Sequence, residues 1–152
     1  MLLAFLPVAA AAVAGSLATR PGLSTWYPRL QKPSFNPPNA VFAPVWSLLY
    51  LLMAYAFYRV LKTGISWTSE TVLVFLLQLF LNSSWSVVFF GLRCILCALF
   101  LVEILLVFIG ISMFLFWKVD LTAGVLLIPY FIWVSFANIL NLQIWKLNRA
   151  YL

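Results

Sequence analysis

The chain has 152 residues, of which 66% are hydrophobic and 8% are charged, and its mean hydropathy is +1.10. This composition is far too apolar for a soluble domain of the same length, so it excludes a soluble fold and places the chain in a lipid bilayer. The net charge of +6 lies on no recognisable soluble module, and we interpret it as membrane topology and lipid headgroup contact, not as a nucleic-acid interface.

Five apolar stretches predict five membrane-spanning helices. A helix needs roughly 20 apolar residues to cross a bilayer. The candidate stretches are residues 2–18, 44–61, 71–90, 95–117 and 122–145. They leave little chain for anything else. The predicted fold is therefore an all-α integral membrane bundle of five transmembrane helices, forming a single domain over residues 1–152.

The first stretch, residues 2–18, also has features of a secretory signal, because it is rich in alanine and ends near small residues. A secretory signal starts with a positively charged region, however, and no Lys or Arg precedes this stretch. We therefore expect it to be retained as the first helix. Its removal would leave four.

The segment between Trp26 and Trp46 joins the first two predicted helices and is rich in proline and aromatic residues. Its prolines are Pro28, Pro33, Pro37, Pro38 and Pro44. Proline fixes φ and pushes the preceding residue toward extended geometry, so the segment is predicted to be a stiff loop without helix. A long loop of this kind usually has a function.

Basic residues are unevenly divided between the two predicted membrane surfaces. The side opposite the N-terminus carries six of them and no acid: Arg20, Arg29, Lys32, Arg93, Lys146 and Arg149. The other side carries Arg59, Lys62 and Lys118 together with Glu70 and Asp120. Because cytoplasmic loops carry the excess of Lys and Arg, the long loop and the C-terminus are predicted to face the cytoplasm.

Three of the predicted helices place aromatic and amide side chains on one face, at the period of a helix. These faces are Trp46, Leu49, Tyr50, Met53 and Phe57 in the second helix, Gln78, Asn82, Trp85 and Phe89 in the third, and Trp133, Phe136, Ala137, Leu140 and Asn141 in the fifth. Taken singly, the amides, Asn138 included, are explained as links between helices, each worth about 0.6 kcal/mol. Taken together, the faces predict an aromatic pocket with a few polar groups for a flat, hydrophobic ligand.

Two features of the fourth stretch remain open. Cys94 and Cys97 lie three residues apart, but a chain with no histidine and no further cysteine cannot complete a four-ligand zinc site, and no metal site is predicted. The two thiols are either small apolar helix residues or a disulfide.

Glu103 lies inside the span, where a carboxyl group is by default a functional hypothesis. The alternative is that the Glu103 carboxyl group has no function and is accommodated in the membrane by being protonated or by a bond to a neighbouring helix.

Three blocks of the sequence carry a resemblance to a known family. The first block is Trp26-Tyr27, Leu30, Lys32-Pro33, Pro37-Pro38, Phe42, Pro44 and Trp46, followed by Leu49-Tyr50 and Met53. The others are Asn82, Trp85 and Phe89-Phe90-Gly91, and then Pro129-Tyr130, Trp133, Phe136-Ala137, Leu140-Asn141 and Trp145. In these blocks the chain resembles the translocator protein family, the tryptophan-rich sensory proteins, known in animals as the peripheral benzodiazepine receptor. The resemblance covers nearly the whole chain.

The resemblance implies a ligand pocket inside the bundle. In the family, tryptophans at the positions of Trp46 and Trp133 are linked to porphyrin binding and light-dependent porphyrin breakdown, and the position of Trp85 lines the drug pocket. With the residues it adds, the predicted ligand-binding set is Phe42, Ala43, Val45, Trp46, Leu49, Tyr50, Asn82, Trp85, Phe89, Cys97, Phe100, Trp133, Phe136, Ala137, Leu140 and Asn141. The predicted lid over the pocket is Trp26, Tyr27, Lys32, Pro33, Pro37 and Pro38.

The sequence departs from the family pattern in several places. Animal members have tryptophan and alanine where this chain has Cys97 and Phe100. The third helix has Val74 and Gln78 where a glycine dimer motif is expected, which weakens the case for a homodimer. The sterol motif expected near Lys146 lacks its tyrosine, and a sterol partner rests only on a loose match at Leu52, Tyr55 and Arg59.

Three functions are consistent with the sequence. The first is a membrane receptor or translocator for tetrapyrroles such as protoporphyrin and haem, and for other flat hydrophobic ligands. No cofactor is expected, and without histidine only Tyr, Met or Cys could bind haem iron, so the ring should dominate the affinity. The second is light-dependent porphyrin degradation, with Trp46 and Trp133 as electron or radical partners. Few acids are present, so conventional catalysis is not expected.

The third function is a non-catalytic stress sensor or scaffold whose ligand changes its association with other membrane proteins. A channel is disfavoured because no rings of charge are evident. The chain shows neither a presequence nor the basic tail of animal relatives. We therefore expect a bacterial envelope membrane, with the mitochondrial outer membrane as the alternative.

Overall fold

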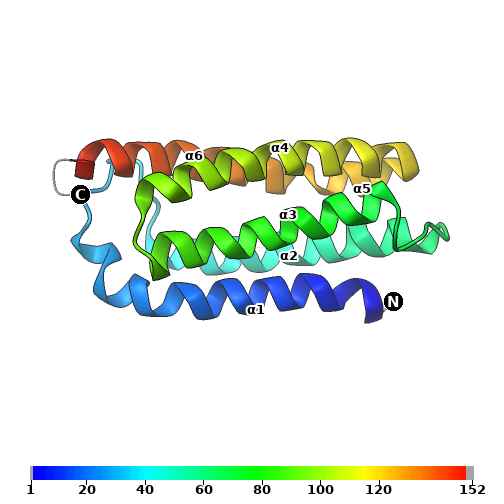
Figure 1. Cartoon of the computed structure of the whole chain (residues 1–152), viewed down its shortest axis with the longest axis horizontal. Helices are drawn as coiled ribbons and strands as arrows, with labels where there is room; N and C mark the ends of the chain where they lie inside the picture. The colour runs from blue at the N-terminus through cyan, green and yellow to red at the C-terminus, as the bar shows by residue number, and fades with distance from the viewer. Residues whose placement is uncertain (1, 150–152) are drawn as a thin grey trace.

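The computed structural model describes residues 2–149, and within this range the chain is helical and has no β-strand (Figure 1). Five segments of the described chain are long and apolar enough to cross a membrane. They are residues 3–25, 39–62, 70–91, 95–119 and 121–148. This confirms the predicted all-α bundle of five transmembrane segments.

The helices follow one another up and down the bundle. α1 (Leu2–Thr25) leads through the short 3-10 turn η1 (Tyr27–Arg29) to α2 (Asn39–Lys62), and α3 (Glu70–Ser86) continues into the π-helix η2 (Val87–Gly91). α4 (Ile95–Val119), α5 (Leu121–Leu126) and α6 (Ile128–Asn148) complete the bundle. The α1–α2 loop, the turn before α4 and the end of α6 lie together at one end of the bundle, which we call the loop end (Figure 1).

α1 extends past the predicted boundary at residue 18 and ends at Thr25, although it contains Pro21. Pro21 supplies no N–H for the carbonyl of Leu17, and membrane helices tolerate such a proline. Near this end of the helix the Thr25 hydroxyl also donates to the Pro21 carbonyl, over 2.7 Å. Gly22 lets this end of α1 lie directly against η2, since a Cβ there would come within 2.6 Å of the carbonyl oxygen of Phe90.

The segment between Trp26 and Trp46 is only partly the non-helical loop that its prolines predict. α2 begins at Asn39, directly after its N-cap Pro38, so the end of the segment is helical. Pro44 lies inside this helix. Its missing N–H leaves the carbonyl of Ala40 without an intrahelical partner, and Ala40 is exposed in the first turn, where the environment can solvate that carbonyl.

The last turn of the third span widens into η2, where the backbone N–H of Leu92 donates to the carbonyl of Val87 over 2.9 Å. Consecutive side chains of a regular α-helix point about 100° apart. The wider π-turn instead brings two consecutive rings, Phe89 and Phe90, to the inside of the bundle, with only 2% and 9% of their surface exposed. Such π-turns are frequent at functional sites.

The fifth span is not the continuous helix that the sequence predicts. It breaks at Leu127 into α5 and α6, and Pro129 lies in the first turn of α6. Proline has no N–H and its ring clashes with the carbonyl four residues earlier, so the helix is interrupted there. Gly124 allows α5 to pack against α4, because a Cβ would come within 2.8 Å of the Trp117 backbone.

A stack of three buried phenylalanines closes the end of the bundle opposite the loop end. Phe57 is stacked with Phe75 and with Phe116, at 4.6 and 6.4 Å between ring centroids, Phe75 lies 4.9 Å from Phe116, and all three are fully buried. Beside the stack, Arg59 of α2 donates to the Asp120 carboxylate over 2.8 Å, and Asp120 also accepts the backbone N–H of Ala123 as the N-cap of α5. This end of the molecule is therefore tightly packed.

Candidate ligand-binding site

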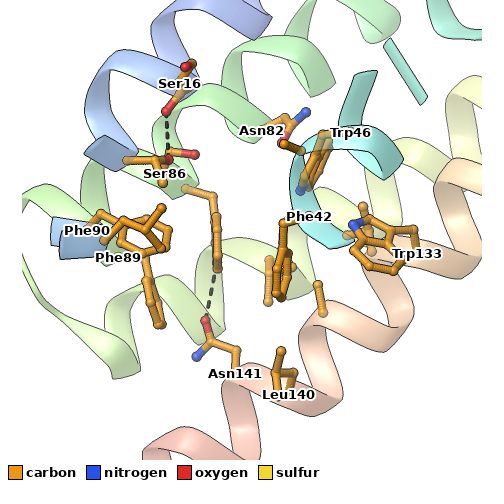
Figure 2. Close-up of a pocket in the computed structure, with 18 of the residues that line it drawn as sticks. Ser16, Phe42, Trp46, Asn82, Ser86, Phe89, Phe90, Trp133, Leu140 and Asn141 are labelled. Atoms are coloured by element: carbon orange, nitrogen blue, oxygen red, sulfur yellow. Dashed lines mark hydrogen bonds between the residues drawn. The ribbon is translucent and has the colours of Figure 1, made fainter. Parts of the chain in front are cut away.

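A cavity of about 410 Å³ lies in the half of the bundle nearer the loop end. Figure 2 shows some of the side chains that line it. Its walls come from α1, η1, α2, α3, η2, α4 and α6. Its volume falls within the range of small-molecule sites, roughly 300 to 1,000 Å³. Most of the side chains that line it are aromatic, aliphatic or small, with a few amides and hydroxyl groups among them.

Most of the predicted ligand-binding residues line this cavity. These are Phe42, Ala43, Trp46 and Tyr50 from α2, Asn82, Trp85 and Phe89 from α3 and η2, and Trp133, Ala137, Leu140 and Asn141 from α6. Figure 2 shows Phe42, Trp46 and Trp133 on one side of the cavity and Phe89 and Phe90 on the other. The three faces that the helical period predicted therefore meet around one space.

Five predicted residues do not line the cavity. Leu49 is 3% exposed and belongs to the core of the bundle, and Val45 packs against the same core. Phe136 lies beside the α1–α2 loop, with its ring centroid 6.3 Å from that of Phe35. Cys97 and Phe100 are exposed on the outer face of α4. α4 turns Val102 and Leu105 to the cavity in their place.

Of the predicted lid residues, only Tyr27 lines the cavity, while Trp26, Lys32, Pro33, Pro37 and Pro38 lie outside its walls. The Tyr27 hydroxyl donates to the Asn36 side-chain oxygen over 3.0 Å. The Lys32 ammonium lies 4.7 Å from the centre of the Tyr27 ring. Burial raises the pKa of the Tyr27 phenol and lowers the pKa of Lys32. The phenol therefore stays neutral at physiological pH.

A two-point link fastens the loop to the end of α6. The backbone N–H of Gln31 donates to the Asn148 side-chain oxygen over 3.0 Å, and the Asn148 amide donates back to the Gln31 carbonyl over 2.9 Å. Trp26 adds an edge-to-face contact with Phe89, at 5.3 Å between ring centroids. The loop is thus held over the loop end of the cavity by contacts to two separate helical segments.

Asn141 positions Trp85 in the cavity wall. The Trp85 indole N–H donates to the Asn141 side-chain oxygen over 3.3 Å, the dashed line at Asn141 in Figure 2. The Asn141 amide donates to the carbonyl of Ile95 over 3.0 Å. The Trp85 ring also stacks on Phe89, with centroids 5.0 Å apart. One buried amide therefore joins α3, α4 and α6 at the cavity.

A second set of polar contacts lies deeper in the bundle. The Asn82 amide donates to the Tyr50 hydroxyl over 3.4 Å, and the Tyr130 hydroxyl donates to the Gln78 side-chain oxygen over 2.9 Å. Gln78 is 1% exposed, so it faces the interior and not an outer surface where a second copy of the chain would dock. In these contacts the amides link helices, as their ordinary interpretation predicts.

The two candidate photochemical tryptophans, Trp46 on α2 and Trp133 on α6, each pack against other aromatic rings. The Trp46 ring lies 5.5 Å from Tyr50 and 6.3 Å from Tyr130, and Trp133 lies 5.8 Å from Phe42. The indole nitrogen of Trp133 is buried and has no hydrogen-bond partner within residues 2–149. Trp133 itself lines the cavity, so this unpaired buried donor belongs to a residue of the site.

Sequence reasoning missed one wall of the cavity completely. α1 contributes Ala12, Gly15, Ser16, Thr19, Arg20 and Leu23. The remaining lining residues that were not predicted are Asn39, Ser47, Ser86, Phe90, Val102, Leu105, Val134 and Ile144. The α1 residues are mostly small and carry no aromatic stripe. The close approach of α1 at Gly15, where a Cβ would lie 3.5 Å from the Ser86 hydroxyl, is visible only in three dimensions.

The sequence left two features of α4 undecided, the Cys94–Cys97 pair and Glu103, and both lie outside the cavity. Cys94 and Cys97 form a disulfide at the start of the helix, which decides between the alternatives left by the sequence. Glu103 is on the exposed side of α4. Its side chain makes no ion pair or hydrogen bond within the described part of the chain, so the structure gives it no place in the site.

Comparison with known proteins identifies related sequences over almost the same range. The model of the TspO/MBR family matches residues 3–146. The tryptophan-rich protein TspO of Chlorobaculum tepidum is 42% identical over 139 residues, which cover 89% of this chain and 87% of that protein. Protein CrtK of Rhodobacter capsulatus is 35% identical, over 95% of this chain and 89% of its own length. The translocator protein of Homo sapiens is 37% identical, over 83% of this chain and 76% of its own length.

Proposed function

Because this chain belongs to the TspO/MBR family, as its sequence motifs predicted, we propose that it is a membrane receptor or translocator that binds tetrapyrroles such as protoporphyrin and haem. The observation that carries the proposal is the cavity, into which Trp46, Trp85 and Trp133 project from three different helices. Indole rings bury a large area and stack on flat aromatic systems. Other flat hydrophobic molecules would occupy the same space.

The ring of the tetrapyrrole supplies the affinity in this proposal, and the metal does not. The chain has no histidine, and the only side chains of the cavity wall that could bind haem iron are the phenols of Tyr27 and Tyr50. The Tyr50 hydroxyl already accepts a hydrogen bond from Asn82. A phenol must lose its proton to bind iron strongly, and burial, which raises the pKa of Tyr27, opposes that loss there.

Titration with haem and with metal-free protoporphyrin tests this proposal. We expect both to saturate, with dissociation constants within about threefold of each other, because no imidazole is available to favour iron. A strong preference for haem would show that an iron ligand is involved. No saturable binding of either compound would remove the tetrapyrrole from the function altogether.

A second candidate function is the light-dependent breakdown of the bound porphyrin. It is favoured by the position of Trp46, which lines the cavity and has Tyr50 and Tyr130 as ring neighbours that could pass an electron onward. Light excites the porphyrin, which takes one electron from the indole and passes it to dioxygen, giving superoxide. The indole radical cation then takes an electron back from the porphyrin ring, and superoxide adds to the ring cation so formed, which opens the ring. Illumination of the complex should bleach the porphyrin at a rate that falls when Trp46 and Trp133 are both replaced by Phe. An unchanged rate would dispose of this candidate.

The same proposal includes an orientation, with the loop end in the cytoplasm of a bacterial envelope membrane. The segments that meet at that end (Figure 1) carry Arg20, Arg29, Lys32, Arg93, Lys146 and Arg149. At the other end one of the three basic residues, Arg59, is paired with Asp120. The positive-inside tendency then places the loop end on the cytoplasmic side. Labelling of a single cysteine introduced in the loop, by an impermeant reagent from each side of intact vesicles, tests the orientation.

A further inference from the structure

The exposed residues of the cavity wall, within the described part of the chain, all lie on α1 and α2. Six of the residues that line it are exposed: Ser16, Arg20 and Leu23 on α1, and Asn39, Ala43 and Ser47 on α2. The other lining residues are buried or half-buried. The opening therefore runs along the two helices that the loop connects.

The opening faces the half of the bilayer nearer the loop end. Asn39 is the first residue of α2, and α1 ends at Thr25. Ser16 lies nine residues before that end, or roughly 14 Å at 1.5 Å per residue, which is about half the thickness of the hydrocarbon core. A molecule in the opening therefore has one end at the membrane surface and the other among the apolar walls of the cavity.

Arg20 is the one charged side chain among the described residues that line the cavity. It lies five residues before the end of α1, close to the membrane surface. None of the three acidic residues of the chain can neutralise it. Glu70 begins α3 at the opposite end, Asp120 is paired with Arg59 there, and Glu103 is on the outer face of α4.

We propose that Arg20 is the carboxylate-binding residue of this cavity, so that the ligands it selects are flat amphiphiles carrying an acidic group at one edge. This inference rests on the proposed function, because the tetrapyrrole is the flat body that fills the cavity. The ring lies among the indoles, and its carboxylate lies at the opening, where the guanidinium can donate two parallel hydrogen bonds to it. Arg20 is a binding residue in this account and has no role in light-driven chemistry.

The test compares protoporphyrin with its dimethyl ester, which keeps the ring and removes both negative charges. Binding is measured by quenching of tryptophan fluorescence in nanodiscs of phosphatidylcholine. For the wild-type protein we expect the acid to bind about tenfold more tightly than the ester, since only the charged carboxylate can accept strong hydrogen bonds from the guanidinium. Arg20→Gln should lower the affinity for the acid to the level of the affinity for the ester. The affinity for the ester should not change.

Two further variants separate the contact from general charge effects. Arg20→Lys keeps the positive charge and should retain most of the preference. Arg29→Gln removes an equally basic side chain at the same end of the molecule but outside the cavity, and it should keep the full preference. The unchanged affinity of Arg20→Gln for the ester shows that this variant is folded.

Three results would overturn the inference. Equal affinity of the wild-type protein for acid and ester would mean that no carboxylate is bound. If Arg29→Gln lowers the affinity for the acid as much as Arg20→Gln does, the preference comes from the positive charge of the surface and not from a contact with Arg20. Disappearance of the preference when phosphatidylglycerol is added to the nanodiscs would assign Arg20 to a lipid headgroup. Failure of both acid and ester to bind would instead contradict the proposed tetrapyrrole function, so the two failures are distinguishable.

Discussion

Trp85 of α3 donates its indole N–H to the side-chain oxygen of Asn141 on α6 over 3.3 Å, and both residues lie in the cavity wall. The amide group of Asn141 is also bonded, to the carbonyl of Ile95. A single side chain therefore fixes the orientation of an indole in the cavity wall and the start of α4. The cavity and the helix packing are not independent features of this molecule.

Replacement of Asn141 by Leu, which has a similar volume, should destabilise the protein and weaken ligand binding. The indole of Trp85 and the carbonyl of Ile95 would each lose a buried partner, at a cost of about 1–3 kcal/mol for each unsatisfied group. Thermal unfolding in detergent and porphyrin titration measure the two effects. Asn138→Leu on the same helix is the control, because the Asn138 side chain makes no hydrogen bond within residues 2–149 and should change neither quantity much. Equal effects in the two variants would contradict this role of Asn141.

Replacement of Asn148 by Ala should release the loop from the end of α6 and speed ligand dissociation. Both bonds to Gln31 disappear, each worth about 1 kcal/mol, so the dissociation rate should rise about thirtyfold if the loop must lift for the ligand to leave. Stopped-flow fluorescence measures this rate. Gln143→Ala, at a half-buried position of the same helix, should leave it unchanged. A dissociation rate in Asn148→Ala equal to that of the wild type would show that the loop does not cover the exit.

Replacement of Phe75 by Ala should destabilise the bundle and spare the site. Phe75 is fully buried in contact with Phe57 and Phe116, and removal of a buried phenylalanine ring typically costs about 3–5 kcal/mol. The stack lies at the end away from the cavity, so porphyrin affinity should stay within about twofold at a temperature where the variant is folded. Phe80→Ala on the same helix is the control, since its ring is 67% exposed. If Phe80→Ala lowers the melting temperature as much as Phe75→Ala, the stack is not the source of the stability.

The pair of Arg59 and Asp120 should give the protein a pH-dependent stability at acid pH. The hydrogen bonds from the Arg59 guanidinium hold the pKa of Asp120 below its ordinary value of 3.8. Because the pKa is lower in the folded state, the contribution is complete above the unfolded value and is lost as the pH falls through the folded one. Both side chains are partly exposed, so the effect is small.

The melting temperature of Asp120→Asn measures this contribution. At neutral pH the wild type should melt slightly higher than Asp120→Asn, which retains an N-cap side chain for α5. The difference should shrink on acidification below about pH 4. A difference that is constant over this range would show that the carboxylate charge contributes nothing.

The helical period predicted most of the site because large side chains recur on single faces. Trp46 and Tyr50 on α2, and Trp133 with Ala137 on α6, point to the cavity for this reason. The same pattern placed Leu49 at the cavity, although it lies in the core. A stripe on a helix fixes which side chains share a face. It does not fix how the helix is rotated against its neighbours.

The elements that sequence reasoning misjudged are those in which the backbone leaves the regular helix or small residues form the contact. The π-turn of η2 brings Phe90 inward, a rotation that the period of 3.6 residues does not describe. Pro129 divides the fifth span. Gly15 and Ser16 of α1 form a wall with no aromatic signal, and with them Arg20, the charged residue of the cavity, was left out of the site.

A dark titration with protoporphyrin tests the central claim most directly. Tryptophan fluorescence is followed in the purified wild-type protein and in the double variant Trp46→Phe, Trp133→Phe, whose substitutions preserve aromatic packing in the cavity wall. We predict saturable quenching of the wild-type protein in the low micromolar range, and its loss in large part in the double variant. Saturation with the same affinity in both proteins would place the ligand elsewhere, and no saturable quenching in either would show that this cavity has another ligand.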